Sequence, residues 1–170
     1  MKIILSVLLL LLAGAAPLAA GKTPGEVEVG GVLRDLPMQG LNGPSLLLSD
    51  YRGKPLIINV WASWCGPCRQ EMASLERLFR RGGKKFAVIG ISTDDYREPA
   101  KAFLQYYKTS FSHFIDSVPF PLENMLGANR LPLTLLIDAQ GRVLGKYYGA
   151  KQWDSPEAVA AIEKAFRIRI

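Results

Sequence analysis

The feature that most constrains this fold is an apolar segment that runs directly into two closely spaced cysteines. Residues 55–62 read PLIINVWA, and this apolar run between turn residues predicts a strand buried on both faces. Residues 67–81 follow with apolar side chains at helical spacing, and the glycines at 82 and 83 end the predicted helix. The cysteines, Cys65 and Cys68, therefore lie where a buried strand gives way to a helix.

The rest of the chain continues the alternation of strands and helices. The pattern predicts a short strand and then a turn around Gly53 within 45–54, and another short strand over 111–116. Longer strands are predicted over 86–92, 132–138 and 143–149, and helical segments over 94–108, 121–126 and 155–168. Asp94 or Asp95 is expected to cap the helix over 94–108, and Ser155 the last helix. This order predicts an α/β domain whose mixed central sheet has helices on both faces.

The N-terminal residues 1–20 have the layout of a secretory signal peptide. A positive start at Lys2 precedes a long apolar run that ends in small residues. The alternative is a retained membrane anchor, but Pro17 and the small-residue tail favour cleavage. We therefore expect a signal peptide over 1–20, an irregular extension with one hairpin over 21–44, and the folded domain over 45–170. The domain is expected to work outside the cytoplasm, with membrane contact only if the leader is retained.

The net charge does not indicate a nucleic-acid partner. The formal charge is +6, and it would fall to +5 on removal of the leader, whose only charged residue is Lys2. The basic residues are scattered, apart from RRGGKK at 80–85, which coincides with the end of a predicted helix, where cations are favoured. We interpret this cluster as a solvated helix end, and nothing in the sequence indicates an organic cofactor.

The two cysteines are placed for chemistry rather than for bracing the fold. A disulfide between Cys65 and Cys68 closes a very small loop, which constrains an unfolded chain little. Cys65 is expected at the helix N-terminus, where unpaired N–H groups and the helix dipole lower a thiol pKa. Cys65 is thus the predicted attacking sulfur and Cys68 the resolving one. Trp64 is expected to keep one side of the site apolar, while Pro67 starts the helix.

Two other functions remain open from the residues alone. A structural zinc needs four ligands, which two cysteines and one histidine do not supply, but a copper-binding or delivery module could use Cys65, Cys68 and His113. His113 lies in the apolar stretch FSHFI and is interpreted as strand packing. A peroxidase related to peroxiredoxins would carry Thr or Ser three residues before its cysteine, where this chain has Ala62.

Two longer stretches carry a family resemblance. LSDYRGKPLIINVWASWCGPCRQEM and RLPLTLLIDAQGRVLGKYYG resemble the TlpA-like thiol-disulfide oxidoreductases of the thioredoxin superfamily, over about residues 40 to 168. The resemblance implies a thioredoxin-like fold with an added segment, within 93–126, between the active-site βαβ unit and the C-terminal hairpin. It also implies that Pro132 is a cis-proline facing the dithiol and that Leu131 offers its backbone to a substrate peptide.

Glu71 is the predicted proton acceptor of the site. Helical geometry of about 100° per residue places it on the same side as Cys68, where burial would raise its pKa. The alternative is a surface glutamate paired with Lys or Arg. TlpA-like relatives carry an acid at this position, whereas ordinary thioredoxins use an aspartate in the preceding strand, where this chain has Asn59. Two positions depart from the family pattern: Ala73 replaces a frequent proline, and Leu133 weakens assignment to the cytochrome c maturation branch.

The resemblance also implies a direction of electron flow and a set of partners. The Gly-Pro pair between the cysteines is that of thioredoxin, a reductant poised at about −270 mV, in contrast to oxidants near −120 mV. We therefore expect a reductant of disulfides in exported proteins, resupplied by a transmembrane thiol relay. Apo-cytochrome c, copper-site proteins and damaged secreted proteins are the candidate substrates.

Overall fold

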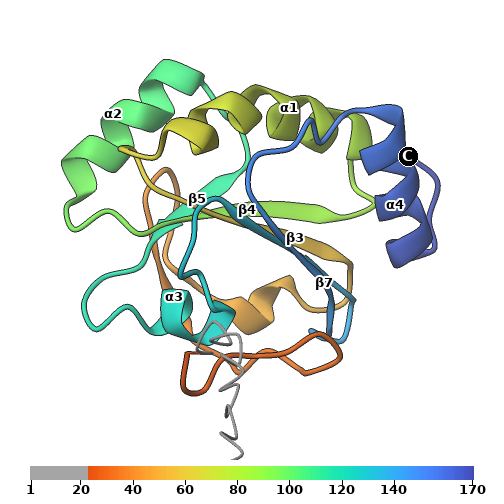
Figure 1. Cartoon of the computed structure of the whole chain (residues 1–170), viewed down its shortest axis with the longest axis horizontal. Helices are drawn as coiled ribbons and strands as arrows, with labels where there is room; N and C mark the ends of the chain where they lie inside the picture. The colour runs from red at the N-terminus through yellow and green to blue at the C-terminus, as the bar shows by residue number, and fades with distance from the viewer. Residues whose placement is uncertain (1–22) are drawn as a thin grey trace, which may run out of the picture.

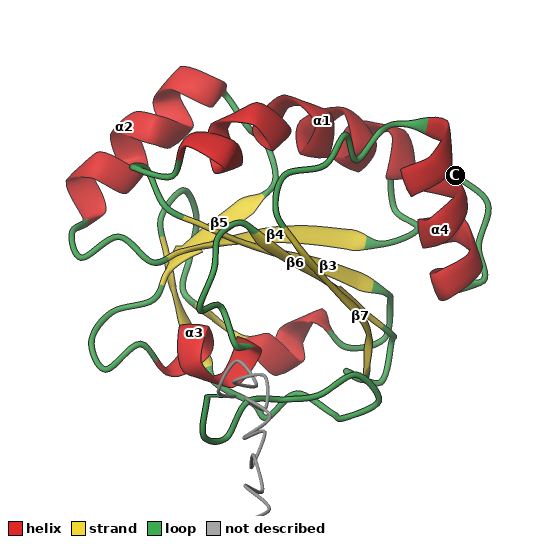
Figure 2. Cartoon of the chain, in the orientation of Figure 1, coloured by secondary structure: helices red, strands yellow, loops and turns green. Residues whose placement is uncertain are grey.

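The computed structural model describes residues 23–170, so the predicted signal peptide lies outside the described residues. Figures 1 and 2 show one central sheet with helices packed on its two faces. The strands are β1 (Pro37–Gly40), β2 (Leu46–Leu47), β3 (Leu56–Trp61), β4 (Ala87–Ser92), β5 (Ser112–Ile115), β6 (Leu133–Ile137) and β7 (Val143–Tyr148). The helices are α1 (Gly66–Gly82), α2 (Arg97–Tyr107), α3 (Pro121–Leu126) and α4 (Pro156–Phe166), with a 3-10 helix, η1, at Leu48–Tyr51.

The sheet has the order β2-β1-β5-β4-β3-β6-β7. The three inner strands β3, β4 and β5 are parallel, while β1 and β6 join them antiparallel. The predicted mixed sheet is therefore confirmed. All six residues of β3 are buried, as the apolar run predicted, because β3 lies between two neighbours and under helices on both faces.

Two apolar cores lie on opposite faces of the sheet. On one face α1, α2 and α4 pack over Trp61 and Ile57 of β3. On the other face α3, η1 and part of the N-terminal extension pack over Ile58 and Val60 of the same strand. Side chains of alternate β3 residues therefore pack into different cores. The prediction of helices on both faces of the sheet is confirmed (Figure 2).

The regions before and after the active-site unit both add to the sheet. Residues 93–126 hold α2, β5 and α3, and β5 extends the parallel part of the sheet beyond β4. The extension contributes β1, which pairs with β5 on one side and forms a hairpin with β2 on the other. Residues 37–40 therefore belong to the same sheet as the active-site strand.

The predicted cap of α2 is wrong. This helix begins at Arg97, and its N-cap residue is Tyr96, whose side chain makes no capping hydrogen bond. Asp94 does not cap α2 because its carboxylate accepts hydrogen bonds from Ser63 and Ser92 instead. The predicted cap of α4 is confirmed, since the Ser155 hydroxyl accepts the N–H of Ala158 at 3.2 Å.

Within residues 23–170, none of the helices has the length and apolar character that crossing a membrane requires.

Candidate active site

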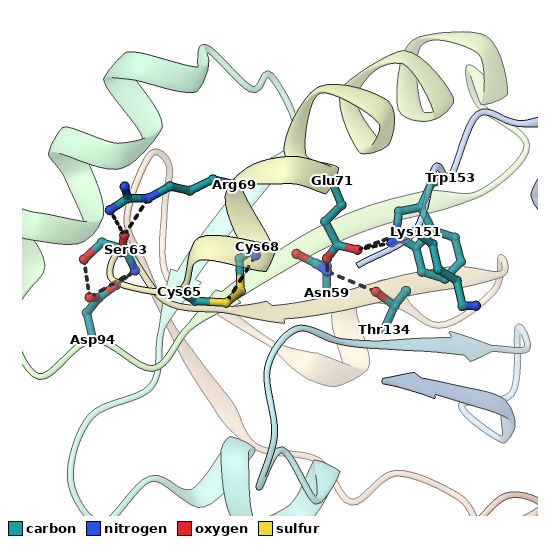
Figure 3. The surroundings of a disulfide bond; sticks show 10 residues. All are labelled: Asn59, Ser63, Cys65, Cys68, Arg69, Glu71, Asp94, Thr134, Lys151 and Trp153. Carbon is teal, nitrogen blue, oxygen red and sulfur yellow. Dashed lines mark hydrogen bonds between the residues drawn. A yellow bond between two sulfur atoms is a disulfide. The ribbon is translucent and has the colours of Figure 1, made fainter. Parts of the chain in front are cut away.

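Cys65 is the N-cap residue of α1, the 17-residue helix that follows β3. Its sulfur accepts the backbone N–H of Cys68 at 3.2 Å, and the two cysteines form a disulfide (Figure 3). Pro67 lies in the first turn, where it removes no intrahelical hydrogen bond. When the disulfide is reduced, the unpaired N–H groups of this turn and the helix dipole favour a thiolate at Cys65 over one deeper in the helix.

The two sulfurs differ in their access to solvent. Cys65 is 4% exposed and lines a surface groove of about 590 Å³, whereas Cys68 is completely buried and does not line it. Trp64, which is 68% exposed, forms one edge of the same groove. Cys65, the predicted attacking sulfur, therefore borders the groove, and Cys68, the predicted resolving sulfur, does not.

The groove is also lined by Leu131, two residues before β6 begins. The Leu131–Pro132 peptide bond is cis, as the family resemblance implied, and Leu131 lines the same groove as Trp64 and Cys65. Pro132 is buried, and its carbonyl accepts the N–H of Gly149 at 2.9 Å. A second cis bond, Val118–Pro119, was not anticipated. Trp64, Cys65 and Leu131 are thus brought together, whereas Glu71 lies away from the groove.

Glu71 is fully buried on the inner side of α1. Its Oε1 accepts the amide of Asn59 at 2.7 Å, and its Oε2 accepts the indole N–H of Trp153 at 2.9 Å and the backbone N–H of Lys151 at 3.2 Å (Figure 3). Burial raises the pKa of Glu71 above its usual value, although these hydrogen bonds oppose the shift. The alternative of a surface glutamate in an ion pair is therefore wrong, and the predicted raised pKa is confirmed.

Asn59 connects the carboxylate to the neighbouring strand. Its amide nitrogen donates to Glu71 and also to the Thr134 hydroxyl of β6, at 3.0 Å. All three side chains are buried. The strand position that holds an acid in ordinary thioredoxins thus holds a neutral donor in this chain, and the acid projects from the helix onto it.

A second hydrogen-bonded cluster holds the loop that leads to Cys65. The carboxylate of Asp94 accepts the N–H of Ser63 at 2.9 Å and its hydroxyl at 2.6 Å, and it accepts the hydroxyl of Ser92 at 2.7 Å. From the other side, Arg69 of α1 donates to the Ser63 carbonyl at 2.8 Å. Ser63 is therefore held at all three of its polar groups, two residues before the predicted nucleophile (Figure 3).

His113 does not join the cysteines. It is buried in β5, where its ring packs against Trp61 and Phe111, and its Nε2 is 2.9 Å from the Thr109 hydroxyl. Burial lowers the pKa of His113 to about 3. Among residues 23–170, no three His, Cys, Asp or Glu side chains are grouped so that they could hold a metal ion. The interpretation of His113 as strand packing is confirmed.

Comparison with known proteins identifies the family. Residues 21–162 match the Redoxin family. The chain belongs to the Redoxin family. Its similarity to the thiol-disulfide oxidoreductase ResA of Geobacillus thermodenitrificans is 31% identity over 118 residues, which cover 69% of this chain and 67% of ResA. The thioredoxin-like protein YneN of Bacillus subtilis is 29% identical over 127 residues, 72% of this chain and 73% of YneN.

Solved structures of thiol-disulfide exchange proteins share the fold of this chain. A crystal structure from Chlorobium tepidum, described as a candidate thiol:disulfide interchange protein DsbE, superposes with a TM-score of 0.75 and 27% identity, over 83% of this chain and 99% of the other. A DsbF homologue from Corynebacterium diphtheriae superposes with a TM-score of 0.67 and 27% identity, over 77% of this chain and 86% of the other. This Redoxin-family chain is a TlpA-like member of the thioredoxin superfamily and a thiol-disulfide oxidoreductase.

Sequence reasoning missed several residues of this Redoxin-family site. Trp153 and Thr134 contact the Glu71–Asn59 pair from segments about 80 residues further along the chain. Thr134 has one local signal, a hydroxyl within the apolar run of β6, whereas Trp153 stands among polar residues that gave no signal. Asp94 gave a stronger signal, an acid just after a buried strand, but the same signal fits a helix cap.

Proposed function

We propose that this chain is a reductant of disulfides in exported proteins. The observation that carries the proposal is the difference between the two sulfurs. Cys65, at the head of α1, borders the groove, whereas Cys68 lies buried behind it. This arrangement allows one sulfur to meet a foreign disulfide and keeps the other for an intramolecular step.

The reaction has two thiol-disulfide exchanges. The Cys65 thiolate attacks one sulfur of the partner's disulfide, forms a mixed disulfide and releases the partner's other sulfur as a thiolate. Cys68 then loses its proton and attacks the Cys65 sulfur, so that the partner leaves with both sulfurs reduced. Two electrons pass to the partner, and the Cys65–Cys68 disulfide present in this structure is the oxidised product.

In this mechanism Glu71 accepts the proton of Cys68. Burial raises the pKa of Glu71 toward the pKa of a thiol, and the smaller difference favours proton transfer from Cys68 to Glu71. Leu131 offers its backbone to the extended chain of the partner beside Trp64, and Pro132 fixes the shape of that edge of the groove. If Glu71→Gln leaves the pH dependence of disulfide exchange unchanged, Glu71 is not the proton acceptor.

The proposed direction of the reaction and its proposed partners rest on the cysteine motif and on the signal peptide predicted over 1–20. The intervening Gly66-Pro67 pair is that of thioredoxin, so we expect a reduction potential near −270 mV, far below the −120 mV or so of strong oxidants. Such a reductant outside the cytoplasm needs a transmembrane thiol relay that supplies electrons. Exported proteins with disulfides, including apo-cytochrome c and copper-site proteins, are the proposed substrates.

The test is a trapping experiment in the native compartment. Cys68→Ser leaves Cys65 able to attack but unable to be released, so it should accumulate a mixed disulfide whose partner mass spectrometry identifies. Cys65→Ser is the matched control and should trap nothing, because Cys68 does not border the groove. Equal trapping by both variants would contradict the assignment, and a potential near −120 mV would reverse the proposed direction.

A further inference from the structure

A short segment between β7 and α4 covers the buried carboxylate of Glu71. Its backbone N–H at Lys151 and the indole N–H of Trp153 both donate to Oε2. The same segment is fastened to α1 a second time at Ser74, whose hydroxyl lies 3.3 Å from the Lys151 carbonyl and accepts the backbone N–H of Trp153 at 3.1 Å. Only the first of these two attachments touches the carboxylate.

Trp153 lies between Glu71 and the outside of the molecule. The indole is 2% exposed and packs edge-on against Tyr147, with ring centroids 5.9 Å apart. It also lines a surface pocket of about 340 Å³, together with Tyr147, Lys151 and residues of α4, and Glu71 does not line this pocket. The indole is therefore part of the wall that separates the carboxylate from solvent on this side.

The two oxygens of the Glu71 carboxylate accept different numbers of hydrogen bonds. A carboxylate oxygen has two lone-pair positions, and Oε2 already accepts two N–H groups, whereas Oε1 accepts only the Asn59 amide. A proton that arrives at Glu71 therefore finds its open position on Oε1. Figure 3 shows Asn59 on the side of the carboxylate toward the dithiol and Trp153 on the opposite side.

The groups around Glu71 come from four parts of the chain. Asn59 of β3 and Thr134 of β6 are neutral, the cysteines lie at the start of α1, and the positive charge that acts on Glu71 is that of Lys151. Burial raises the pKa of Glu71, and the Trp153 hydrogen bond is the largest of the contributions that lower it. Because an indole N–H can only donate, it stabilises the anion and not the proton on the same oxygen.

We propose that Trp153 is a positioning residue for disulfide exchange: its indole N–H keeps the Glu71 carboxylate ionised and directs the incoming proton to Oε1. The proposal deepens the proposed function, since it rests on Glu71 as the proton acceptor for Cys68. It assigns a role to a side chain that does not line the groove beside Cys65.

The test removes the indole N–H and measures Glu71 directly. Trp153→Phe should raise the Glu71 pKa by about one to two pH units, the effect of losing one hydrogen bond to a charged group. The titration is measured by NMR on protein labelled with 13C at the glutamate carboxyl, with Glu71→Gln to assign the signal. Benzothienylalanine at position 153 keeps the shape of the indole but lacks its N–H, and it should give the same shift if Trp153→Phe does not fold.

Ser74→Ala is the matched control. It removes the second attachment of the segment but leaves both donors to Oε2 in place, so the protein should lose stability while the Glu71 titration stays at its native position. In exchange assays, the pH inflection that disappears in Glu71→Gln should move upward in the position-153 variants and stay in place in Ser74→Ala.

Two results would overturn the proposal, and they are distinguishable. An unchanged Glu71 titration in both position-153 variants, or an equal shift in Ser74→Ala, would reduce Trp153 to a packing residue while leaving the function of Glu71 intact. If Glu71→Gln leaves the pH profile of disulfide exchange unaltered, Glu71 is not the proton acceptor. Trp153 then has no role in exchange either, even if its replacement shifts the Glu71 titration in the NMR experiment.

Discussion

Replacement of Asp94 by alanine tests whether the loop before Cys65 is held by tertiary hydrogen bonds. In the native protein the Asp94 carboxylate accepts two groups of Ser63 and the hydroxyl of Ser92. Asp94 and Ser92 are buried, whereas Ser63 is only partly buried. The variant therefore leaves the Ser92 hydroxyl without its acceptor in the interior, while water can replace part of what Ser63 loses.

The magnitude follows from these three bonds. A buried polar group left without its partner costs about 1–3 kcal/mol, and a solvent-accessible one costs less. We therefore expect Asp94→Ala to lower the free energy of unfolding by about 3 kcal/mol, or the melting temperature by about 6–12 °C for a domain of this size. Because Ser63 lies two residues before Cys65, loss of its anchor should also slow attack by Cys65 about tenfold or more.

The assay is urea denaturation of the oxidised protein, with disulfide-reductase turnover measured in parallel. Asp95→Ala is the matched control because Asp95 is the exposed neighbour, and it should change stability by less than about 0.5 kcal/mol. If the two variants have the same denaturation midpoint and the same turnover, the Asp94 cluster does not hold the active-site loop.

Two further predictions concern the core. His113 is neutral in the folded protein because burial lowers its pKa to about 3, so the unfolded chain binds a proton below pH 6.5 that the folded chain does not. Its contribution to stability is present above pH 6.5 and should fall by about 3 kcal/mol between pH 7 and pH 4, a slope that His113→Phe should remove; equal slopes in both proteins would contradict a neutral, buried His113. Gly90→Ala would bring a methyl group within 2.2 Å of the His113 ring and 2.8 Å of the Trp61 indole nitrogen, and should lower the free energy of unfolding by about 1–3 kcal/mol. Gly43→Ala is the control, because the space around Gly43 is open, and it should not lower stability. Equal thermal denaturation of the two variants would show that the core between β4 and β5 accommodates the added methyl group.

The elements around the dithiol were predictable because their signals are local. The apolar run of β3 and the helical spacing of α1 each reflect a few neighbouring residues, and so does the Ser155 cap. The same local geometry placed Glu71 on the inner side of α1, which is where it lies. The cis Leu131–Pro132 bond was expected from the family resemblance rather than from local physics.

The error at Asp94 shows where local reasoning ends. An aspartate shortly before a helix can cap that helix or accept hydrogen bonds from elsewhere, and the local sequence is the same in both cases. Asp94 accepts hydrogen bonds from Ser63, 31 residues earlier, because the loop that leads to Cys65 passes beside it.

The sequence by itself determined the dithiol, the strand and helix that present it, and the position of Cys65 at the start of that helix. These depend on chain geometry over a few residues, which every folded form of that segment shares. Only the tertiary structure decided what surrounds the chemistry: the indole and amide that hold Glu71, the serines that hold Asp94, and the groove that Leu131 completes. The decisive contacts join groups far apart in the chain, 31 residues for Ser63 and Asp94 and 82 for Glu71 and Trp153, so they depend on how whole strands and helices pack.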